Sequence, residues 1–268
     1  MFTLDQQKAI AFLQHDLLRN IVPLKMLTAY PTAIQTSYWE TATDAAALLL
    51  FPTSAFPYDR ATYPALDLVV LLSATTSAAA MTLLPHIPSD KQLIFKLMDE
   101  GIRDQLVRHV ALQRVTAFLS FTATVAEKFI PQPDVVIADQ MDEQLYPVFA
   151  AQGHDRAELT RYFANGQARS FTLYRASAPV AACFTYQNFA TVHEIGGVFT
   201  LPSERRKGYA QKVVATAVHS LLTRNCLPRY QVHEHNHASI ALAEHLGLTP
   251  FVAVEHWQYA PPNPGVVV

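Results

Sequence analysis

The sequence predicts an α/β (α+β) protein built from two consecutive domains. Short β-branched or apolar runs alternate with segments of helical periodicity along the whole chain, which is typical of mixed folds. A length of 268 residues exceeds that of most single domains. The segment Pro131-Gln132-Pro133 excludes a continuing helix and gives the best boundary. We therefore expect domains at residues 1–130 and 131–268.

Composition narrows the class of protein. Half of the residues are hydrophobic (50%), 16% are charged and the net charge is −2. This balance favours a globular chain and gives no electrostatic reason to expect a nucleic-acid partner. Cys183 and Cys226 are too few for a disulfide framework or a metal site, so a reducing compartment is the simpler inference. Residues 1–19 contain no uninterrupted signal-peptide core, and we expect a cytoplasmic protein.

One apolar stretch bears on membranes, because residues 68–84 carry no charge. The stretch contains several Ser and Thr residues and is at the short limit for a spanning helix. A buried strand followed by a helix that stops at Pro85 and Pro88 explains it without a bilayer. No membrane partner is expected.

The first half reads as two helices followed by three strands, with helices and strands then alternating. Apolar residues at helical spacing indicate the helices, and runs rich in Tyr, Trp, Leu and Thr between proline-rich loops indicate the strands. The expected helices are 4–18, 23–30, 76–84 and 100–110, and the expected strands are 34–40, 46–51, 67–72, 91–97 and 114–124.

The second half begins with a short strand and two helices. Gly166 closes the second helix, and a turn at residues 176–179 separates two strands. Asn236 is well placed to cap the last helix, and Gly247 follows its end. The expected helices are 141–151, 156–165, 210–222 and 238–246, the expected strands are 135–138, 170–175, 180–187, 191–200, 227–235 and 251–258, and residues 261–268 are expected to form a loose tail.

A strand, a basic turn and a helix start follow one another within residues 198–210. Arg205, Arg206 and Lys207 precede Gly208, and apolar residues then recur with helical spacing up to Leu222. A helix N-terminus offers unpaired N–H groups and partial positive charge, and a preceding glycine lets the backbone approach a ligand closely. The arrangement suits a pyrophosphate, although a solvated basic turn before a helix is the alternative.

Arg205-x-x-Gly208-x-Ala210 resembles the acetyl-CoA pyrophosphate loop of the GNAT N-acetyltransferase superfamily. The resemblance implies a GNAT fold, with a mixed central sheet flanked by helices, in two tandem domains. The first half has the family's order of elements, but its equivalent segment, residues 73–77, lacks both glycine and cations. We therefore expect a degenerate first domain and a catalytic second one, a layout similar to the glycine N-acyltransferase group.

Gly196 and Gly197 lie inside a predicted strand, where glycines often mark a bulge. In the family such a bulge opens the slot for the pantetheine arm. The resemblance implies that the Val198 N–H faces the thioester carbonyl and that the Thr200 backbone pairs with pantetheine. The alternative is a glycine pair packed under an aromatic ring such as Phe199.

Glu194 lies where the histone acetyltransferase branch places its general base, and a simple pleat puts it on the face of Val198. The resemblance implies that it takes the amine proton. An exposed strand glutamate paired with Lys or Arg is the alternative. His193 is a weaker candidate for the base.

Asn236-x-x-Ser239-x-x-Leu242 resembles the family's second coenzyme segment. Ala243 departs from it, because many members have a tyrosine there that is proposed to protonate the leaving thiolate. The residues expected to bind coenzyme are Val198, Phe199, Thr200, Arg205, Arg206, Lys207, Gly208, Tyr209, Ala210, Asn236 and Ser239.

The expected function is acyl-CoA-dependent N-acyl transfer, with acetyl-CoA as co-substrate and a small-molecule or protein amine as acceptor. The alternative is a non-catalytic acyl-CoA sensor or interaction module, which the missing tyrosine at position 243 and the degenerate first half favour. The run His233-Glu234-His235-Asn236-His237 suggests a metal site, but its last histidine should already belong to the helix, and no metal is expected. The acceptor and the oligomeric state, including a homodimer, stay open.

Overall fold

The computed structural model describes residues 2–261 and divides the chain into two compact units. The first unit comprises the chain up to Phe118 together with the chain from Val252 onward, and the second runs from Leu119 to Phe251. The expected tail at residues 261–268 lies, from residue 262, outside the described residues. No helix within the described range is long and apolar enough to cross a membrane.

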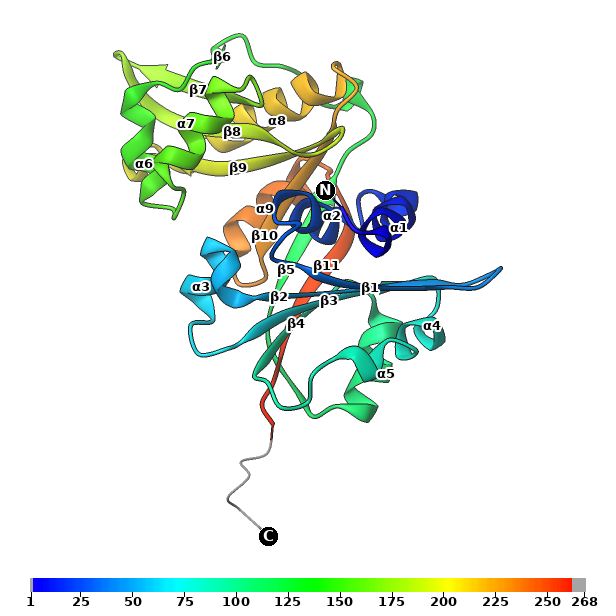
Figure 1. Cartoon of the computed structure of the whole chain (residues 1–268). Helices are drawn as coiled ribbons and strands as arrows, with labels where there is room; N and C mark the ends of the chain where they lie inside the picture. The colour runs from blue at the N-terminus through cyan, green and yellow to red at the C-terminus, as the bar shows by residue number, and fades with distance from the viewer. Residues whose placement is uncertain (1, 262–268) are drawn as a thin grey trace. The chain divides into compact units, whose positions relative to one another are not determined.

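The first unit begins with a capped helix, since the Thr3 hydroxyl accepts from the Gln6 N–H and the Gln6 side chain accepts from the Thr3 N–H. Its elements (Figure 1) are α1 (Leu4–Leu13), the 3₁₀ turn η1 (Gln14–Asp16), α2 (Ile21–Ala29), β1 (Gln35–Glu40), β2 (Ala45–Pro52), α3 (Pro57–Thr62), β3 (Leu68–Ala74), α4 (Ser77–Met81), β4 (Leu93–Leu97), α5 (Glu100–His109) and the start of β5 (Leu112–Thr122).

The strands of this unit lie in the order β1, β2, β3, β4 and β11 (Thr249–Tyr259). Only β3 and β4 run parallel, and the other pairs are antiparallel. Helices α1 and α2 lie on one face of these strands and α4 and α5 on the other (Figure 1). Side chains of β3 alternate between two apolar clusters, with Val69 and Leu71 in the cluster of α1 and α2, and Val70 and Leu72 in the cluster of α4 and α5. A strand buried on both faces accounts for the uncharged run at 68–84.

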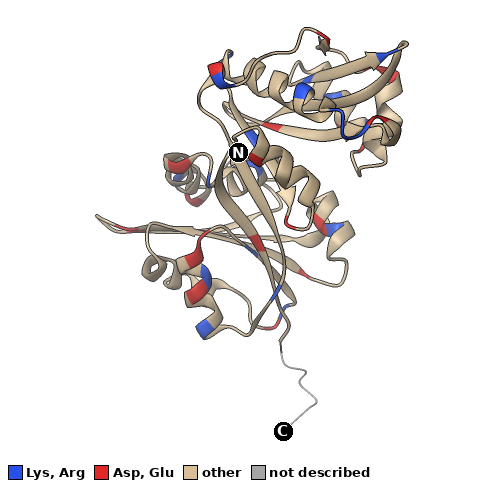
Figure 2. Cartoon of the chain, turned by 180° about the vertical axis from the view of Figure 1, so that it is seen from behind, with Lys and Arg blue, Asp and Glu red and all other residues tan. Residues whose placement is uncertain are grey.

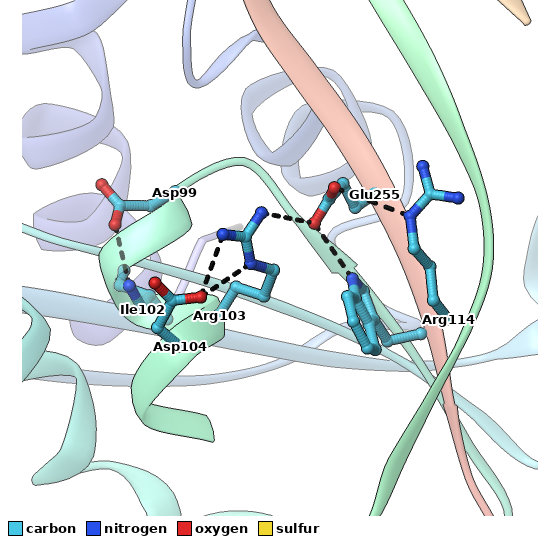
Figure 3. Close-up of polar contacts among 7 residues, drawn as sticks. Asp99, Ile102, Arg103, Asp104, Arg114 and Glu255 are labelled. Carbon is cyan, nitrogen blue, oxygen red and sulfur yellow. Dashed lines mark hydrogen bonds and ion pairs between the residues drawn. The ribbon is translucent and has the colours of Figure 1, made fainter. Parts of the chain in front are cut away.

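Glu255 on β11 anchors the end of the chain in the first unit (Figure 3). Its Oε2 accepts from Arg103 Nη1 at 3.2 Å and from Trp257 Nε1 at 3.1 Å, and its Oε1 lies 3.7 Å from Arg114 Nε. Arg103 belongs to α5, whose first turn is capped by the Asp99 carboxylate, 2.8 Å from the Ile102 N–H.

The second unit contains the remaining elements. They are the end of β5, β6 (Val135–Ala138), the 3₁₀ turn η5 (Glu143–Leu145), α6 (Tyr146–Ala150), α7 (Arg156–Ala164), β7 (Ala168–Arg175), β8 (Ala178–Phe189), β9 (Val192–Thr200), α8 (Tyr209–Leu222), β10 (Leu227–His233) and α9 (His237–His245). The strands follow the order β5, β10, β9, β8, β7, β6. Strands β9 and β10 run parallel to each other.

Helices α6 and α7 cover one face of this sheet and α8 the other (Figure 1), and each face carries its own apolar cluster. Cys183 of β8 lies in the cluster that includes α8, and its neighbours Ala182 and Phe184 lie in the cluster beneath α6 and α7. The alternation follows the two-residue period of a strand. Charged residues are spread over both units singly or in small groups (Figure 2), in keeping with the 16% charged composition.

The structure departs from the expected elements and units most clearly in three places. The helix expected at 141–151 is split into η5 and α6, because Asp142 caps the first piece and Pro147 starts the second. The proline-rich segment between the strands expected at 46–51 and 67–72, where no helix is expected, contains α3, which Pro57 opens. By contacts, most of β11 groups with the first unit and the end of β5 with the second, so the units differ from the expected 130/131 boundary.

Candidate functional site

Strands β9 and β10, at the centre of the second unit's sheet, pair in parallel at their first residues and stop pairing after that. We call this arrangement a V. Their parallel ladder pairs Val192 with Leu227 and ends with Glu194 opposite Arg229. Strand β9 continues to Thr200 and β10 to His233. The continuing parts of two parallel strands that no longer pair leave a place where a ligand can enter between them.

A β-bulge lies where β9 leaves the ladder. In the pairing with β8, Gly196 faces Phe184 and Phe199 faces Ala182, so two residues of β9 oppose one of β8. Gly197 has a φ of +62°, and a Cβ there would lie 2.5 Å from Phe184. The predicted bulge is confirmed, and the glycine pair is also packed under an aromatic ring, as the alternative held, with Phe184 in place of the suggested Phe199.

The bulge corrects one sequence expectation. Val198 packs in the apolar cluster of α8, whereas Gly196, and with it Glu194 two residues earlier, faces the side of Phe184. Glu194 and Val198 therefore lie on opposite faces of β9. One extra residue in the strand inverts the alternation that a simple pleat predicts.

The basic loop reaches from the end of β9 to the start of α8. Arg205 Nε lies 3.4 Å from the Thr200 carbonyl oxygen, and Gly208, with a φ of +76°, stands at the N-cap without a side-chain cap bond. The first N–H groups of α8 are thus left for a ligand. Lys207 Nζ bonds to Glu204 Oε2 at 2.9 Å, and this hydrogen bond raises the pKa of Lys207.

A cleft of about 960 Å³ connects these features. Every residue predicted to bind coenzyme lines it except Lys207. The residues that sequence reasoning did not include are Val148, Ala151, Gln152, Gln211, Ala238, Ala241, Leu242 and His245. Those from α6 and the turn after it could not be found from the basic motif, because they precede it by some fifty residues and reach the cleft only through tertiary packing.

Helix α9 forms one wall of the cleft. The Asn236 side chain accepts from the Ser239 N–H at 3.1 Å and so caps the helix, as predicted. Ala238, Leu242 and His245 share the face that lines the cleft. Ala243 is fully buried in the core, so the position where the family motif has tyrosine carries no proton donor here.

Glu194 is buried and hydrogen-bonded. Its Oε2 accepts from Arg229 Nη1 at 2.6 Å and from Asn188 Nδ2 at 3.0 Å. Arg229 also donates to Ser120 Oγ at 3.2 Å. The alternative drawn from sequence, a glutamate paired with a basic residue, describes this geometry, except that the pair is buried. Glu194 does not line the cleft.

His193 and His233, which the sequence singles out, make local contacts in the described structure. Burial and the nearby Arg224 lower the pKa of His193 to about 4, so it is uncharged at neutral pH. The His233 Nδ1 accepts from the His235 N–H at 3.2 Å. Among the described residues, no three His, Cys, Asp or Glu side chains form a metal-binding group.

The parallel strands β3 and β4 of the first unit also stop pairing part-way along, but the space beyond their ladder is small. Their ladder ends at Leu71 and Lys96, and beyond it remains a cavity of only about 240 Å³. Arg19, which follows η1, bonds to Asp99 beside this cavity. At the start of α4, the Thr75 and Thr76 hydroxyls donate to the Asp44 carboxylate at 2.9 and 3.2 Å, which places negative charge where the second unit has its basic loop.

Residues 135–255 match the family model of the GNAT acetyltransferases. No curated protein matches the sequence. Among solved structures, the chain is similar to a GCN5-related N-acetyltransferase from Kribbella flavida, with 15% identity, a TM-score of 0.52, and 99% of this chain and 98% of that chain covered.

A tandem GNAT protein from the clavulanic acid biosynthesis pathway is similar over 92% of this chain and 89% of its own, with 13% identity and a TM-score of 0.51. A GCN5-related N-acetyltransferase-like protein from Streptococcus suis has 15% identity and a TM-score of 0.51, with 95% and 98% covered. At these identities the similarity shows the fold, and it confirms the predicted GNAT fold with a mixed sheet flanked by helices.

Proposed function

We propose, from the match of residues 135–255 to the GNAT acetyltransferase family model, that this chain transfers an acetyl group from acetyl-CoA to a primary amine. The amine attacks the thioester directly while both substrates are bound. One observation carries the proposal, namely that Arg205 and Arg206 and the bulge residue Val198 line the same cleft. The cleft thus has a phosphate-binding end and an end suited to a thioester carbonyl.

The basic loop suits the pyrophosphate of the coenzyme. The N–H groups of the first turn of α8 and the two arginine side chains supply hydrogen bonds and positive charge at one point. Gly208 lets the backbone approach without a Cβ in the way, since its φ of +76° is unfavourable for other residues. Asn236 and Ser239 on the opposite wall would flank the pantetheine arm.

Val198 would assist the acyl transfer through its backbone. Attack of an amine on a thioester gives a tetrahedral intermediate whose oxygen carries negative charge. A fixed N–H donor aimed at that oxygen is worth about 3–4 kcal/mol. Because a thiolate leaves readily, the reaction does not depend on the tyrosine that Ala243 replaces.

An acceptor screen tests the proposal. The protein would be incubated with acetyl-CoA and a panel of polyamines, amino acids, aminoglycosides and lysine peptides. The rate of thiol release would be measured, and the mass of each product would be determined by mass spectrometry. We expect at least one amine to gain an acetyl group at a rate that depends on protein concentration. A chain with Arg205→Ala and Arg206→Ala is the control for coenzyme-independent acetylation.

A non-catalytic acyl-CoA sensor is the second candidate, and the buried Ala243 favours it because the cleft lacks the family's usual acid at that position. Such a protein would bind acetyl-CoA in the same cleft and release no thiol with any amine. Since both cysteines are free, we place either activity in a reducing compartment such as the cytoplasm.

A further inference from the structure

His154 lies in the segment between α6 and α7, beside the bulge of β9. A methyl group on Gly196 would lie 3.7 Å from its Cε1. The ring contacts Phe184 edge to face, with centroids 4.9 Å apart, and its backbone N–H donates to the Phe149 carbonyl at 3.1 Å. Contacts on both sides hold the imidazole at this point of the strand.

The position of His154 places it closer to the reacting end of the cleft than Glu194. Gly196, which His154 contacts, is two residues closer to Val198 than Glu194 is. At 3.3 Å per residue, Val198 lies roughly 7 Å along the strand from Gly196. The preceding residues Ala151 and Gln152 line the cleft itself. His154 itself does not line the cleft, so the proton of an amine bound at Val198 would pass to the imidazole through a bridging water.

Glu194 is less suited to accept the proton. Its carboxylate is paired with Arg229, and the two side chains are only 8% and 4% exposed. Protonation in each catalytic cycle would leave the buried guanidinium without its counter-ion, which is strongly unfavourable. Glu194 would instead hold Arg229 and Asn188 in place beneath the acceptor side of the strand.

The surroundings of His154 keep its ring neutral. Burial lowers the pKa of His154, and the charge of Glu158 on α7 opposes this in part. Strands β8 and β9 and helix α6 present Phe184, Gly196 and Phe149 to the ring, and none of these titrates. A neutral imidazole at neutral pH is free to accept a proton.

We propose that His154 is the general base of the acetyl transfer, an inference that rests on the proposed function. As the amine nitrogen forms its bond to the thioester carbon, His154 takes the proton that this nitrogen loses. The intermediate then collapses, the carbon–sulfur bond breaks, and CoA leaves as thiolate. The imidazolium gives its proton to solvent, and the thiolate takes one from solvent, so the products are the acetylated amine and free CoA.

His154→Gln tests the role, with His86→Gln, an exposed position in the first unit, as the matched control. Initial rates would be measured with acetyl-CoA and the best acceptor of the screen between pH 5 and 9. We expect His154→Gln to lower kcat roughly 10² to 10⁴-fold with little change in the KM for acetyl-CoA. The acid limb of the unmodified protein, expected below pH about 6.5, should disappear. His86→Gln should retain both the rate and the limb.

A second measurement needs no acceptor. NMR of histidine labelled with ¹³C at Cε1 would follow the His154 signal, identified by its loss in His154→Gln. Acetyl-CoA should shift this signal more than CoA does, and the titration should give a pKa below that of free histidine. A His154 chemical shift that does not change when acetyl-CoA is added, or a His154 ring that is protonated at neutral pH, would overturn the assignment of His154 as general base.

The two proposals fail differently. An unmodified protein that binds acetyl-CoA and acetylates no amine contradicts the proposed function. An unmodified protein that acetylates an amine, with His154→Gln equally fast and equally dependent on pH, contradicts only the role of His154.

Discussion

Arg229 Nη1 donates to Glu194 Oε2 at 2.6 Å across the last pair of the parallel ladder between β9 and β10. The ladder stops at this pair, and the cleft begins beyond it. The Asn188 amide and the Ser120 hydroxyl complete a hydrogen-bond network around the ion pair. This network fixes the two strands at the point from which they diverge.

We predict that Glu194→Gln acts mainly on stability. The substitution keeps the shape and leaves the buried guanidinium without a counter-ion, so the free energy of unfolding should fall by roughly 3–5 kcal/mol in urea denaturation. Glu40→Gln is the control, since Glu40 pairs with Lys8 at the surface, where solvent screens the pair and its loss should change stability little. Unchanged stability with a rate lowered roughly 10² to 10⁴-fold would instead make Glu194 the general base, as the family resemblance implies.

The double substitution Arg205→Ala with Arg206→Ala should weaken CoA binding far more than binding of a pantetheine thioester without the pyrophosphate. Charge-assisted hydrogen bonds at this loop recognise phosphate and no other part of the coenzyme. Calorimetric dissociation constants for both ligands check the prediction. Lys207→Ala is the matched control and should have a smaller effect, because Lys207 pairs with Glu204 and does not line the cleft. Equal losses for both ligands would show that the loop is only structural.

Each chain should bind one coenzyme molecule, in the second unit. In the first unit Asp44 accepts hydrogen bonds at the start of α4, and these bonds, from Thr75 and then Thr43, lower its pKa and keep it charged. The cavity beyond the ladder of β3 and β4, about 240 Å³, is a quarter of the size of the cleft in the second unit, about 960 Å³. Titration calorimetry with acetyl-CoA gives the stoichiometry, and a value near two would be incompatible with a degenerate first unit.

A chain that starts at residue 131 should fail to fold into an active protein, although it contains the whole basic loop and α9. It would lose Thr122, whose hydroxyl donates to the Pro228 carbonyl at 2.7 Å, and Ser120, which bonds to Arg229. Strand β11 would also lose β4, with which it pairs from Leu93 to Leu97. Soluble expression and circular dichroism check this, and a shortened chain with normal coenzyme affinity would refute it.

The local parts of the site could be predicted from sequence, and the non-local parts could not. Gly208, the cations before it and the apolar period of α8 are close together in the chain, so their meaning follows from helix chemistry. Gly196 and Gly197 predicted the bulge, but they did not show that the bulge places the Val198 side chain on the face of β9 opposite Glu194. The pairing of Glu194 with Arg229 and the place of His154 beside β9 depend on tertiary packing, for which neighbouring residues carry no signal.

The same reason explains the domain boundary. Prolines at 131 and 133 mark a real interruption of the chain, but contacts and not chain order decide which unit a strand joins. Strand β11 has its Glu255 bonded to Arg103 of α5, which lies 152 residues earlier in the chain. The assignment of catalysis to the second half stays a prediction.

Transfer of an isotopic label tests the central claim most directly. Acetyl-CoA carrying ¹³C in its acetyl group would be mixed with the protein and its best acceptor amine. The masses of the amine and of the protein would be determined by mass spectrometry at successive times. Direct attack in the cleft predicts label in the amine, in step with released CoA, and none attached to the protein. Label that accumulates on the protein, or that stays in acetyl-CoA with every amine of the panel, would contradict the account.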